Sequence, residues 1–395
     1  MVVTKPKFSL LIPTRNRAHM LKHAIDSALS QTYADIEIVI SNNNSTDQTQ
    51  ALIEKIDDPR VRCIQTQETL AAPYHWEWAL KHVRGEYVTL LCDDDALVPQ
   101  ACSRIAKALN QTQAQMILWH RIAYIYSEWK QCTEVSNSVR VRKYSGQLQE
   151  KKTAENLHQW FESCDYLKHS PLGFNCFCKT SLIEDIHNRH GVFFMPPAPD
   201  VGASLWMLKN LDSYYYIDSP ISLAGVSPVS IGATYSTTSG EAVERFEKEF
   251  KKPVYEYSPC KIPGQVNIVV ETLLWAQKQY PEIFAQYTLN WTNYWAGCLF
   301  DMQRYKLNGV DVSEQIKTLN SQISNLDPCM QSKIKEIVKS RISGIKRHER
   351  KTKLRRRLFG SIGSKSKVIT GNKVGFNNIY ECACKLDQIT GFVDK

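Results

Sequence analysis

Long apolar runs are missing from this chain of 395 residues. No stretch approaches the roughly 18 consecutive apolar residues of a membrane-spanning helix. Lys5 and Lys7 are followed only by the short apolar run of residues 8–12, which Pro13 ends. Such a run is too short for the apolar region of a secretory signal peptide. We therefore expect a cytoplasmic protein without a membrane-spanning segment.

Cysteine pairs at zinc-ribbon spacing are also missing. The twelve cysteines include the C-x-C pairs Cys176/Cys178 and Cys382/Cys384, but no C-x-x-C pair. Zinc ribbons bind their metal through C-x-x-C pairs, so this class is excluded. A large chain without a secretory signal is not expected to depend on a disulfide framework. We expect free thiols, most of them buried as small apolar groups.

Net positive charge is missing outside one segment. The formal net charge is +9, and residues 333–357 alone contribute +10, so the rest of the chain sums to −1. We extend this segment to residue 359 to include its last apolar residues. Three interpretations of its role apply. It attaches to an anionic membrane surface, it binds nucleic-acid phosphate, or it is a solvated basic helix or tail. Because the body of the chain is nearly neutral, we expect no nucleic-acid partner.

Strand and helix patterns alternate over the first hundred residues. Strands are expected at 8–12, 36–40, 61–65 and 87–92, and helices at 18–30, 50–56 and 74–83. Strands separated by helices predict a parallel sheet with helices on its faces. The pattern is mixed from about residue 110 and mainly helical beyond residue 240. We therefore predict an α/β fold in three parts, residues 1–110, 111–240 and 241–395.

Three consecutive carboxylates, Asp93, Asp94 and Asp95, end the apolar run of residues 87–92. Neighbouring like charges repel by roughly 4 kcal/mol at about 4 Å and a dielectric constant of about 20. A divalent cation offsets this repulsion, and Mg²⁺ or Mn²⁺ held by one or two carboxylates plus phosphate oxygens fits best. The alternative is an acidic turn that caps the helix after Pro99.

Polar loops follow three strands of the predicted sheet, at residues 13–17, 41–47 and 93–95. In a doubly wound sheet such loops meet at the carboxyl edge, where ligands bind. The first loop offers backbone and guanidinium donors, the second offers amides and the third offers carboxylates. Together they suit a base, a ribose and a metal-bound diphosphate.

Four segments resemble the family 2 glycosyltransferases, in the order and spacing of that family. They are residues 9–17, 24–33, 37–47 and 85–99. The resemblance is strong over residues 8–105, weak to about 235 and absent beyond. It implies a GT-A type, Rossmann-like sheet that is mixed but mostly parallel and flanked by helices. Residues 1–110 would then bind the nucleotide-sugar, residues 111–240 would bind the acceptor, and 241–395 would be a mainly helical addition.

The resemblance assigns nucleotide contacts by position. Pro13, Thr14 and Arg15 match the loop that contacts the base and ribose, and we include Arg17 of the same loop. Asn43 matches a position that faces the base and usually carries an acidic residue. Since an amide both donates and accepts hydrogen bonds, it allows a uracil base. We expect a UDP-sugar as donor.

The resemblance also assigns the metal ligands. Asp94 matches the main ligand of the family's D-x-D motif, Asp93 lies beside the ribose or the metal, and we take Asp95 as the second metal-binding carboxylate. The first aspartate of the motif is replaced here by Cys92. Mn²⁺ or Mg²⁺ is the expected cofactor.

Asp200 is the candidate catalytic base. The resemblance implies transfer with inversion at the anomeric carbon. Such a transfer needs a group that takes the proton of the acceptor hydroxyl. In the family this is an Asp or Glu in the acceptor half, just before a helix, and Asp200 precedes a predicted helix at 201–211. The alternative is that Asp200 only caps that helix.

The resemblance implies transfer of a sugar from a nucleotide-sugar to a saccharide or lipid-linked saccharide acceptor. We expect this in surface polysaccharide or lipopolysaccharide synthesis, in the cytoplasm or peripherally on the cytoplasmic face of a membrane. The Ser- and Thr-rich residues 227–240 are expected to form a mobile loop that closes over the donor.

Two alternatives remain. A sugar-phosphate nucleotidyltransferase would need a glycine-rich phosphate loop with a lysine after the first strand, and residues 13–17 contain no glycine. A non-catalytic nucleotide- or carbohydrate-binding homologue stays open because Cys92 replaces the first motif aspartate.

Overall fold

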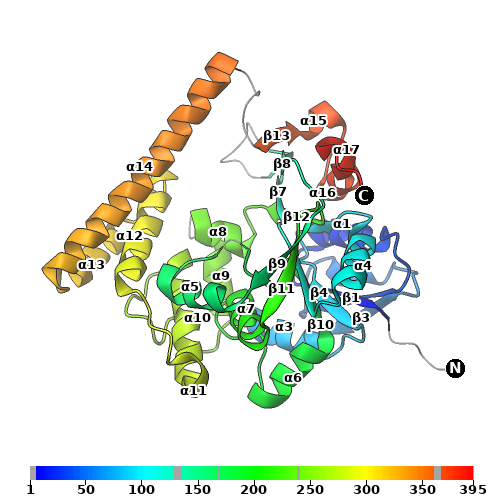
Figure 1. Ribbon diagram of the computed structural model, residues 1–395, viewed down its shortest axis with the longest axis horizontal. Helices are drawn as coiled ribbons and strands as arrows, with labels where there is room; N and C mark the ends of the chain where they lie inside the picture. Colours follow the sequence, from blue (N-terminus) through cyan, green and yellow to red (C-terminus); the bar gives the residue numbers. More distant parts are fainter. Residues whose placement is uncertain (1–5, 129–135, 168, 238–240, 360–365, 395) are drawn as a thin grey trace. The chain divides into compact units, whose positions relative to one another are not determined.

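The chain forms two compact units in a computed structural model, which describes residues 6–128, 136–167, 169–237, 241–359 and 366–394 (Figure 1). The first unit comprises residues 1–154, 169–230 and 366–395, and the second comprises 155–168 and 231–365.

An eight-stranded sheet runs through the first unit in the order β3-β2-β1-β4-β10-β6-β11-β9. Its strands are β1 (Phe8–Thr14), β2 (Ile36–Asn42), β3 (Val61–Gln65), β4 (Tyr87–Leu90), β6 (Met116–Trp119), β9 (Leu148–Lys152), β10 (Cys176–Lys179) and β11 (Ser213–Ile217). Only β9 and β10 run antiparallel to their neighbours in this sheet. The predicted α/β fold with a mixed, mostly parallel sheet is confirmed.

The register of this sheet brings the strand ends together. Thr14 at the end of β1 pairs with Asn42 at the end of β2, and Asn42 pairs with Gln65 at the end of β3. On the other side of β1, Leu11 pairs with Leu90 at the end of β4. The loops that follow β1, β2 and β4 therefore start at the same edge, as the alternating pattern predicts.

Helices of the first unit bury apolar faces against this sheet. They are α1 (Ala18–Leu29), α2 (Thr49–Ile53), α3 (Ala72–Leu80), α4 (Ala101–Thr112), α6 (Thr180–His190) and α7 (Pro199–Asn210). In α1 the buried apolar residues are Met20, Leu21, Ala24, Ile25 and Ala28. This spacing of three and four residues places them on one face of a helix.

A second sheet of the first unit has the order β13-β8-β7-β12-β5. Its strands are β5 (Ala96–Leu97), β7 (Ile122–Ile125), β8 (Ser138–Arg142), β12 (Ser222–Val226) and β13 (Ser366–Thr370). Strand β5 begins directly after Asp95 and pairs with β12. In the sequence, the acidic cluster therefore follows β4 of the first sheet and precedes β5 of the second sheet.

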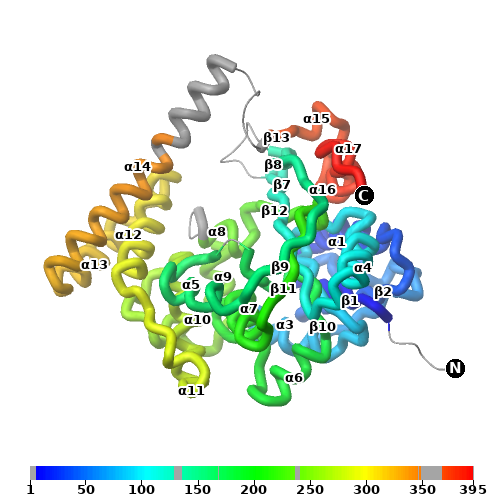
Figure 2. The backbone as a smooth tube through the Cα atoms, in the orientation of Figure 1, coloured from blue at the N-terminus to red at the C-terminus, as the bar shows by residue number. Residues whose placement is uncertain are grey.

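The end of the chain returns to the first unit, whereas the sequence analysis placed it in the helical region 241–395. Strand β13 pairs with β8, and α15 (Gly371–Val374), α16 (Ile379–Cys384) and α17 (Leu386–Thr390) follow it. Buried apolar residues of this segment, among them Phe376, Ile379 and Leu386, belong to the same core as α1 and β5. Figure 2 shows this red segment beside β8 and α1. Burial of these residues explains the return, which their sparse pattern did not predict.

The second unit is helical in its described residues. It contains most of α5 (Ala154–Ser163), then α8 (Ile231–Thr237), α9 (Glu241–Lys248), α10 (Gln265–Gln279), α11 (Pro281–Phe284), α12 (Trp291–Leu307), α13 (Ser313–Ser324) and α14 (Pro328–Phe359). The mainly helical region predicted beyond residue 240 is therefore present. The boundaries at 110 and 240 remain predictions.

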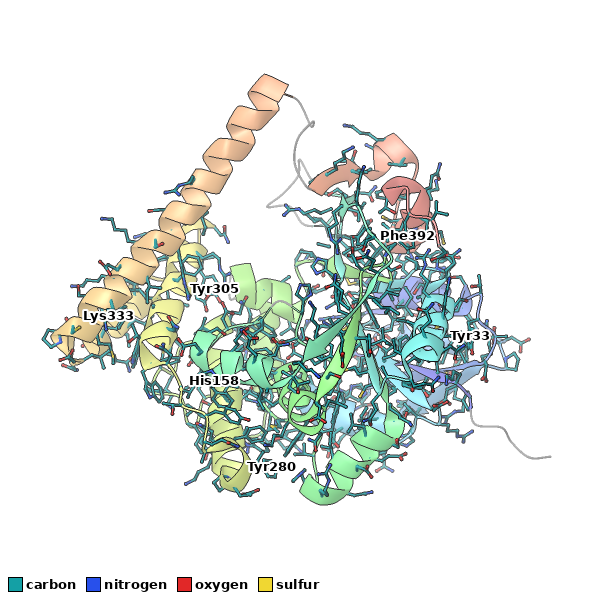
Figure 3. All side chains as sticks on the ribbon, in the orientation of Figure 1. Tyr33, His158, Tyr280, Tyr305, Lys333 and Phe392 are labelled. Carbon is teal, nitrogen blue, oxygen red and sulfur yellow. The ribbon has the colours of Figure 1, made fainter. Side chains whose placement is uncertain are left out.

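The basic segment 333–357 lies within α14, which packs along α12. Figure 3 labels Tyr305 on α12 and Lys333 on α14. The side chains at 346 and 348–359 lie outside the described part of the chain. No helix of the described residues is both long and apolar enough to cross a membrane.

The expectation of a loop over residues 227–240 was wrong for 231–237, which form α8. Tyr235 explains the difference, because its ring is buried and its hydroxyl donates to Glu247 Oε1 at 2.9 Å. Tertiary packing overrides the weak helix propensity of a Ser- and Thr-rich sequence. Residues 238–240 lie outside the described part of the chain.

Candidate functional site

The loops after β1 and β2 are bonded to each other. Asn16 has a left-handed backbone (φ 53°), and its N–H donates to Ser45 Oγ at 3.0 Å. Its side-chain oxygen accepts from the N–H of Thr46 at 2.7 Å. Asp47 Oδ2 accepts from the N–H of Ala18, in the first turn of α1, at 3.0 Å. The two loops thus form one wall at the carboxyl edge of the sheet.

Asp93 is held by the loop after β1. Its carboxylate accepts from Thr14 Oγ1 at 2.8 Å and from Arg17 Nη1 at 2.9 Å. Burial raises the pKa of Asp93, and the charge of Arg17 opposes that rise. The structure therefore brings together three predicted site residues, and it pairs the buried Asp93 with a partly buried cation.

Asp94 has fewer side-chain partners. Its Oδ2 accepts from Ser230 Oγ at 2.5 Å, and Arg17 Nη1 lies 3.8 Å from the same oxygen. Its backbone carbonyl accepts from the Tyr126 hydroxyl at 3.1 Å. Among the described residues, none donates a hydrogen bond to Asp94 Oδ1. This oxygen is the one in the cluster best placed to accept an external ligand.

Asp95 is tied to two other elements. It forms an ion pair with Arg121, and its Oδ1 accepts from the N–H of Gly225 on β12 at 2.9 Å. Burial raises the pKa of Asp95 to about 7, although the charge of Arg121 lowers it. The guanidinium of Arg121 lies 4.4 Å from the centre of the Phe174 ring. Much of the hydrogen-bonding capacity of Asp95 is thus used within the protein.

The cluster has the composition of a divalent-cation site. The Cys92 sulfur and one carboxylate oxygen each of Asp94 and Asp95 lie within 4.8 Å of one another. Burial raises the pKa of the Cys92 thiol well above its ordinary value, so the sulfur is neutral. Mg²⁺ and Mn²⁺ prefer carboxylate oxygens to a thiol. The two carboxylates therefore fit such an ion, and Cys92 does not add a matching ligand.

Asn43 shapes a cavity next to the end of β3. Its side chain donates to the Leu70 carbonyl at 2.8 Å and accepts from the Leu70 N–H at 3.0 Å and from Thr66 Oγ1 at 3.2 Å. The loop that it holds lines a cavity of about 280 Å³, formed by Gln65, Thr66, Gln67, Glu68, Leu70 and Trp78. Asn43 thus fixes the cavity wall, and its direct contact with a base stays a prediction.

The remaining residues of the first loop lie next to this wall. Pro13 is buried in β1, and Arg15 is half-buried. The His75 ring is hydrogen-bonded to Ser41 Oγ at 2.8 Å. Burial, and then the charge of Arg15, lower the pKa of His75 from 6.5 to about 3. The positive charge of Arg15 therefore helps to keep the His75 ring neutral.

Asp200 is the second residue of α7. The N-cap of this helix is Ala198, and Asp200 Oδ1 accepts from the N–H of Val201 at 3.0 Å. Asp200 is therefore not the N-cap residue, which was the alternative role. A carboxylate in the first turn interacts favourably with the dipole of the helix.

Glu77 of α3 fixes the segment that leads to Asp200. Its Oε2 accepts from the N–H groups of Phe193 and Phe194 at 3.0 and 2.8 Å. Its Oε1 lies 3.2 Å from His187 Nε2 in α6. A helix of the predicted nucleotide half thus anchors the segment that carries the candidate base.

Four residues of the site were missed by sequence reasoning: Arg121, Tyr126, Gly225 and Ser230. They contact the acidic cluster from the two residues that flank β7, from β12 and from the turn after β12, more than twenty residues away in the chain. Their contacts depend on the order of the second sheet, which strand patterns do not specify. The one sequence signal for any of these four residues was the Ser-rich composition of residues 227–240, which contain Ser230.

Residues 9–189 match the sequence model of glycosyl transferase family 2. A GalNAc(5)-diNAcBac-PP-undecaprenol beta-1,3-glucosyltransferase of Campylobacter jejuni is 34% identical over 114 residues, which are 28% of this chain and 37% of that protein. The UDP-Glc:alpha-D-GlcNAc-diphosphoundecaprenol beta-1,3-glucosyltransferase WfaP of Escherichia coli is 39% identical over 87 residues, 22% of this chain and 35% of that protein. The matches span little more than a third of the length of these relatives.

Among solved structures, S. aureus TarS 1-349 in complex with UDP-GlcNAc gives a TM-score of 0.47 at 14% identity, over 86% of this chain and 92% of that one. This distant similarity does not indicate which ligand this chain binds or which activity it has. The sequence match is independent of it and covers β1 to β4 with the loops of the acidic cluster. Residues 9–189, somewhat less than half of this chain, thus carry the sequence pattern of glycosyl transferase family 2.

Proposed function

We propose that this protein is an inverting, metal-dependent glycosyltransferase. It moves a sugar from a nucleotide-sugar, which we take to be a UDP-sugar, to a saccharide or lipid-linked saccharide acceptor. The observation that carries the proposal is the acidic cluster at the carboxyl edge of the sheet. Arginines pair with Asp93 and Asp95, and Asp94 Oδ1 is left without a hydrogen bond from the described residues.

Asp94, with Asp95, would hold Mn²⁺ or Mg²⁺. Such an ion stabilises the negative charge that develops on a leaving diphosphate. Arg17 and Thr14 orient Asp93, which lies beside the ion or the ribose. Pro13, Arg15 and Asn43 form the nucleoside side of the site through the wall at the sheet edge.

Asp200 would act as the general base of a single in-line displacement. Its carboxylate takes the proton of the acceptor hydroxyl while that oxygen bonds to the anomeric carbon and the diphosphate leaves. The anchoring of residues 193–194 by Glu77 supports this role, because a base acts only from a fixed position.

The printed names of the relatives support a lipid-linked acceptor. Both are named as glucosyltransferases that act on a diphosphate-linked undecaprenol saccharide. We propose the same acceptor class for this chain, within surface polysaccharide or lipopolysaccharide synthesis, at the cytoplasmic face of a membrane. The matches cover only part of each protein, so the individual sugar is not inferred.

Residues 333–359 would hold the enzyme at the anionic membrane surface that carries such an acceptor. Each Lys or Arg near the headgroups contributes about 1 kcal/mol. The test is co-sedimentation with vesicles of phosphatidylglycerol or of phosphatidylcholine. Binding to the first alone, lost at high salt, is expected. Equal binding to both, or to neither, would contradict this part of the proposal.

The experiment that tests the donor site is a thermal-shift panel of UDP-, GDP-, dTDP- and CDP-sugars with and without Mn²⁺. A ligand at 100 times its dissociation constant adds about 2.7 kcal/mol of stability. We expect a shift with the UDP-sugar that needs Mn²⁺ and is lost in Asp94→Ala. Asp185→Ala, at an exposed position of α6, is the matched control and should retain the shift. No shift with any nucleotide-sugar would reject a transferase.

A non-catalytic homologue is the second candidate, because Cys92 stands where the family has its first motif aspartate. Slow hydrolysis of the bound UDP-sugar by the enzyme with Mn²⁺ separates the two. A transferase hydrolyses the donor when water replaces the acceptor. A binding protein shows the thermal shift without hydrolysis.

A further inference from the structure

The segment from Gly225 to Ser230 lies against the acidic cluster. A methyl group at Gly225 would come within 1.9 Å of the Asp94 carbonyl oxygen, so only glycine allows this approach. The N–H of the same glycine donates to Asp95 Oδ1 at 2.9 Å. Four residues later, the Val229 carbonyl accepts from Arg17 Nη2 at 2.5 Å. The segment is thus fixed to the cluster at several points before it reaches Ser230.

The Ser230 hydroxyl lies 2.5 Å from Asp94 Oδ2 and 3.3 Å from the Gly225 carbonyl. A hydroxyl has one proton to donate, and a carboxylate is the stronger and here the nearer acceptor. The N–H of Ser227 donates to Ser230 Oγ at 3.2 Å, and the Ser227 hydroxyl lies 2.9 Å from the same oxygen. These contacts orient the Ser230 hydroxyl toward Asp94.

We propose that Ser230 is a positioning residue for the divalent cation. Its hydroxyl holds Asp94 Oδ2, which fixes the carboxylate and leaves Oδ1 for the ion. The inference rests on the proposed function, in which Asp94 is the principal metal ligand. Partners that orient a metal ligand commonly change metal affinity by roughly 10- to 100-fold when removed.

Ser230 is also the last residue of the first unit before the chain enters residues 231–365 of the second unit. Ile231, the next residue, begins α8 of the second unit. The carboxylate that would bind the ion is therefore hydrogen-bonded to the point at which the chain leaves the first unit.

The test measures Mn²⁺ affinity in the presence of UDP, from the electron paramagnetic resonance signal of free Mn²⁺. We expect Ser230→Ala to weaken Mn²⁺ binding by about tenfold or more. Ser230→Thr keeps a hydroxyl at the same place and should stay within about threefold of the wild type. Transfer activity of Ser230→Ala should recover at raised Mn²⁺ concentration, which a folding defect would not allow.

Ser222→Ala is the matched control. Ser222 is a buried serine of β12, the strand that carries Gly225, and its hydroxyl accepts from Trp119 Nε1 at 2.7 Å, so this variant also loses a buried, hydrogen-bonded hydroxyl. Its Mn²⁺ affinity should equal that of the wild type. If Ser230→Ala binds Mn²⁺ as the wild type does, or if Ser222→Ala weakens it equally, the role of Ser230 is wrong while the proposed function stands. If the wild type with UDP binds no Mn²⁺, both fall.

Discussion

At the scale of single residues, the three aspartates differ by their partners rather than by their sequence. Asp93 and Asp95 each have an arginine, Arg17 and Arg121, within ion-pair distance of a buried carboxylate. Asp94 has its shortest side-chain contact with a neutral hydroxyl. Arg17 lies farther from Asp94, at 3.8 Å from its Oδ2, so Asp94 is the carboxylate of the cluster best suited to bind an added cation.

This difference predicts opposite results for two matched variants. Asp94→Asn keeps the shape and should lower transfer activity at least a hundredfold, about 2.7 kcal/mol, with little loss of stability. Asp95→Asn leaves Arg121 without its carboxylate and should lower the free energy of unfolding by about 2 kcal/mol. Activity assays and urea unfolding of both proteins check this. Equal activity loss without destabilisation in Asp95→Asn would mean that Asp95 acts mainly as a metal ligand.

His75 predicts a dependence of stability on pH. Its pKa is about 3 in the folded protein and 6.5 ordinarily, because burial and Arg15 disfavour the charged ring. Below pH 6.5 the unfolded chain binds a proton that the folded chain does not, so stability falls as the pH falls toward 3. The contribution of one such group is about 1.4 kcal/mol per pH unit.

The measurement compares wild type with His75→Gln, whose amide can still bond to Ser41. The difference in unfolding free energy between the two should be constant above pH 7 and shift in favour of the variant from pH 6.5 to 4.5. A constant difference over the whole range would show that His75 is not buried in the neutral form.

Individual site residues could be predicted from the sequence only where their loops follow neighbouring strands of the sheet. Thr14, Arg17 and Asp93 were predicted from loops at one sheet edge, and the structure joins them. Ser230 is 136 residues from Asp94 and could not be predicted, because nothing local distinguishes its hydroxyl. Asn43 lies where expected, but the partners of its amide depend on the path of the next loop.

At the scale of elements, the apolar strands and helices of residues 8–112 follow their sequence patterns. The spacing of apolar residues predicts a helix or a strand because it reflects which faces of that element are buried. It does not specify which strands pair when pairing partners are far apart. Strands β12 and β13 pair with β7 and β8, about one hundred and more than two hundred residues earlier.

The contact of β12 with the acidic cluster predicts an asymmetry between two glycines. Gly225→Ala places a methyl group against the Asp94 carbonyl and should lower the free energy of unfolding by about 1–3 kcal/mol, together with Mn²⁺ affinity. Gly232→Ala, on exposed α8 backbone with no neighbour within 4 Å, should be neutral or up to about 1 kcal/mol more stable. Thermal unfolding of both variants checks this. Equal effects would mean that β12 does not approach the cluster as closely as described.

At the scale of the whole molecule, the chain leaves the first unit for the second at residues 155–168 and again at 231–365, and it returns at Ser366. The basic helix α14 is therefore followed by a folded segment rather than by a free tail. Arg104 of α4 pairs with Asp387 and Asp394, and its guanidinium lies 4.8 Å from the centre of the Phe392 ring, which Figure 3 labels. The end of the chain completes the unit that holds the acidic cluster.

The first unit should accordingly depend on residues that lie far beyond its family 2 region. Phe376→Ala removes a fully buried ring from the core shared with α1 and β5, and should cost about 3–5 kcal/mol. That is a large part of the roughly 5–15 kcal/mol that stabilises a domain, so ending the chain at residue 365 should abolish its cooperative unfolding. Val393→Ser, at a side chain 75% exposed in the same segment, is the control and should change stability by less than about 0.5 kcal/mol. Thermal unfolding with and without UDP and Mn²⁺ distinguishes the outcomes. A truncated chain that still unfolds cooperatively and responds to these ligands would show that the returning segment is an accessory to the donor-binding unit.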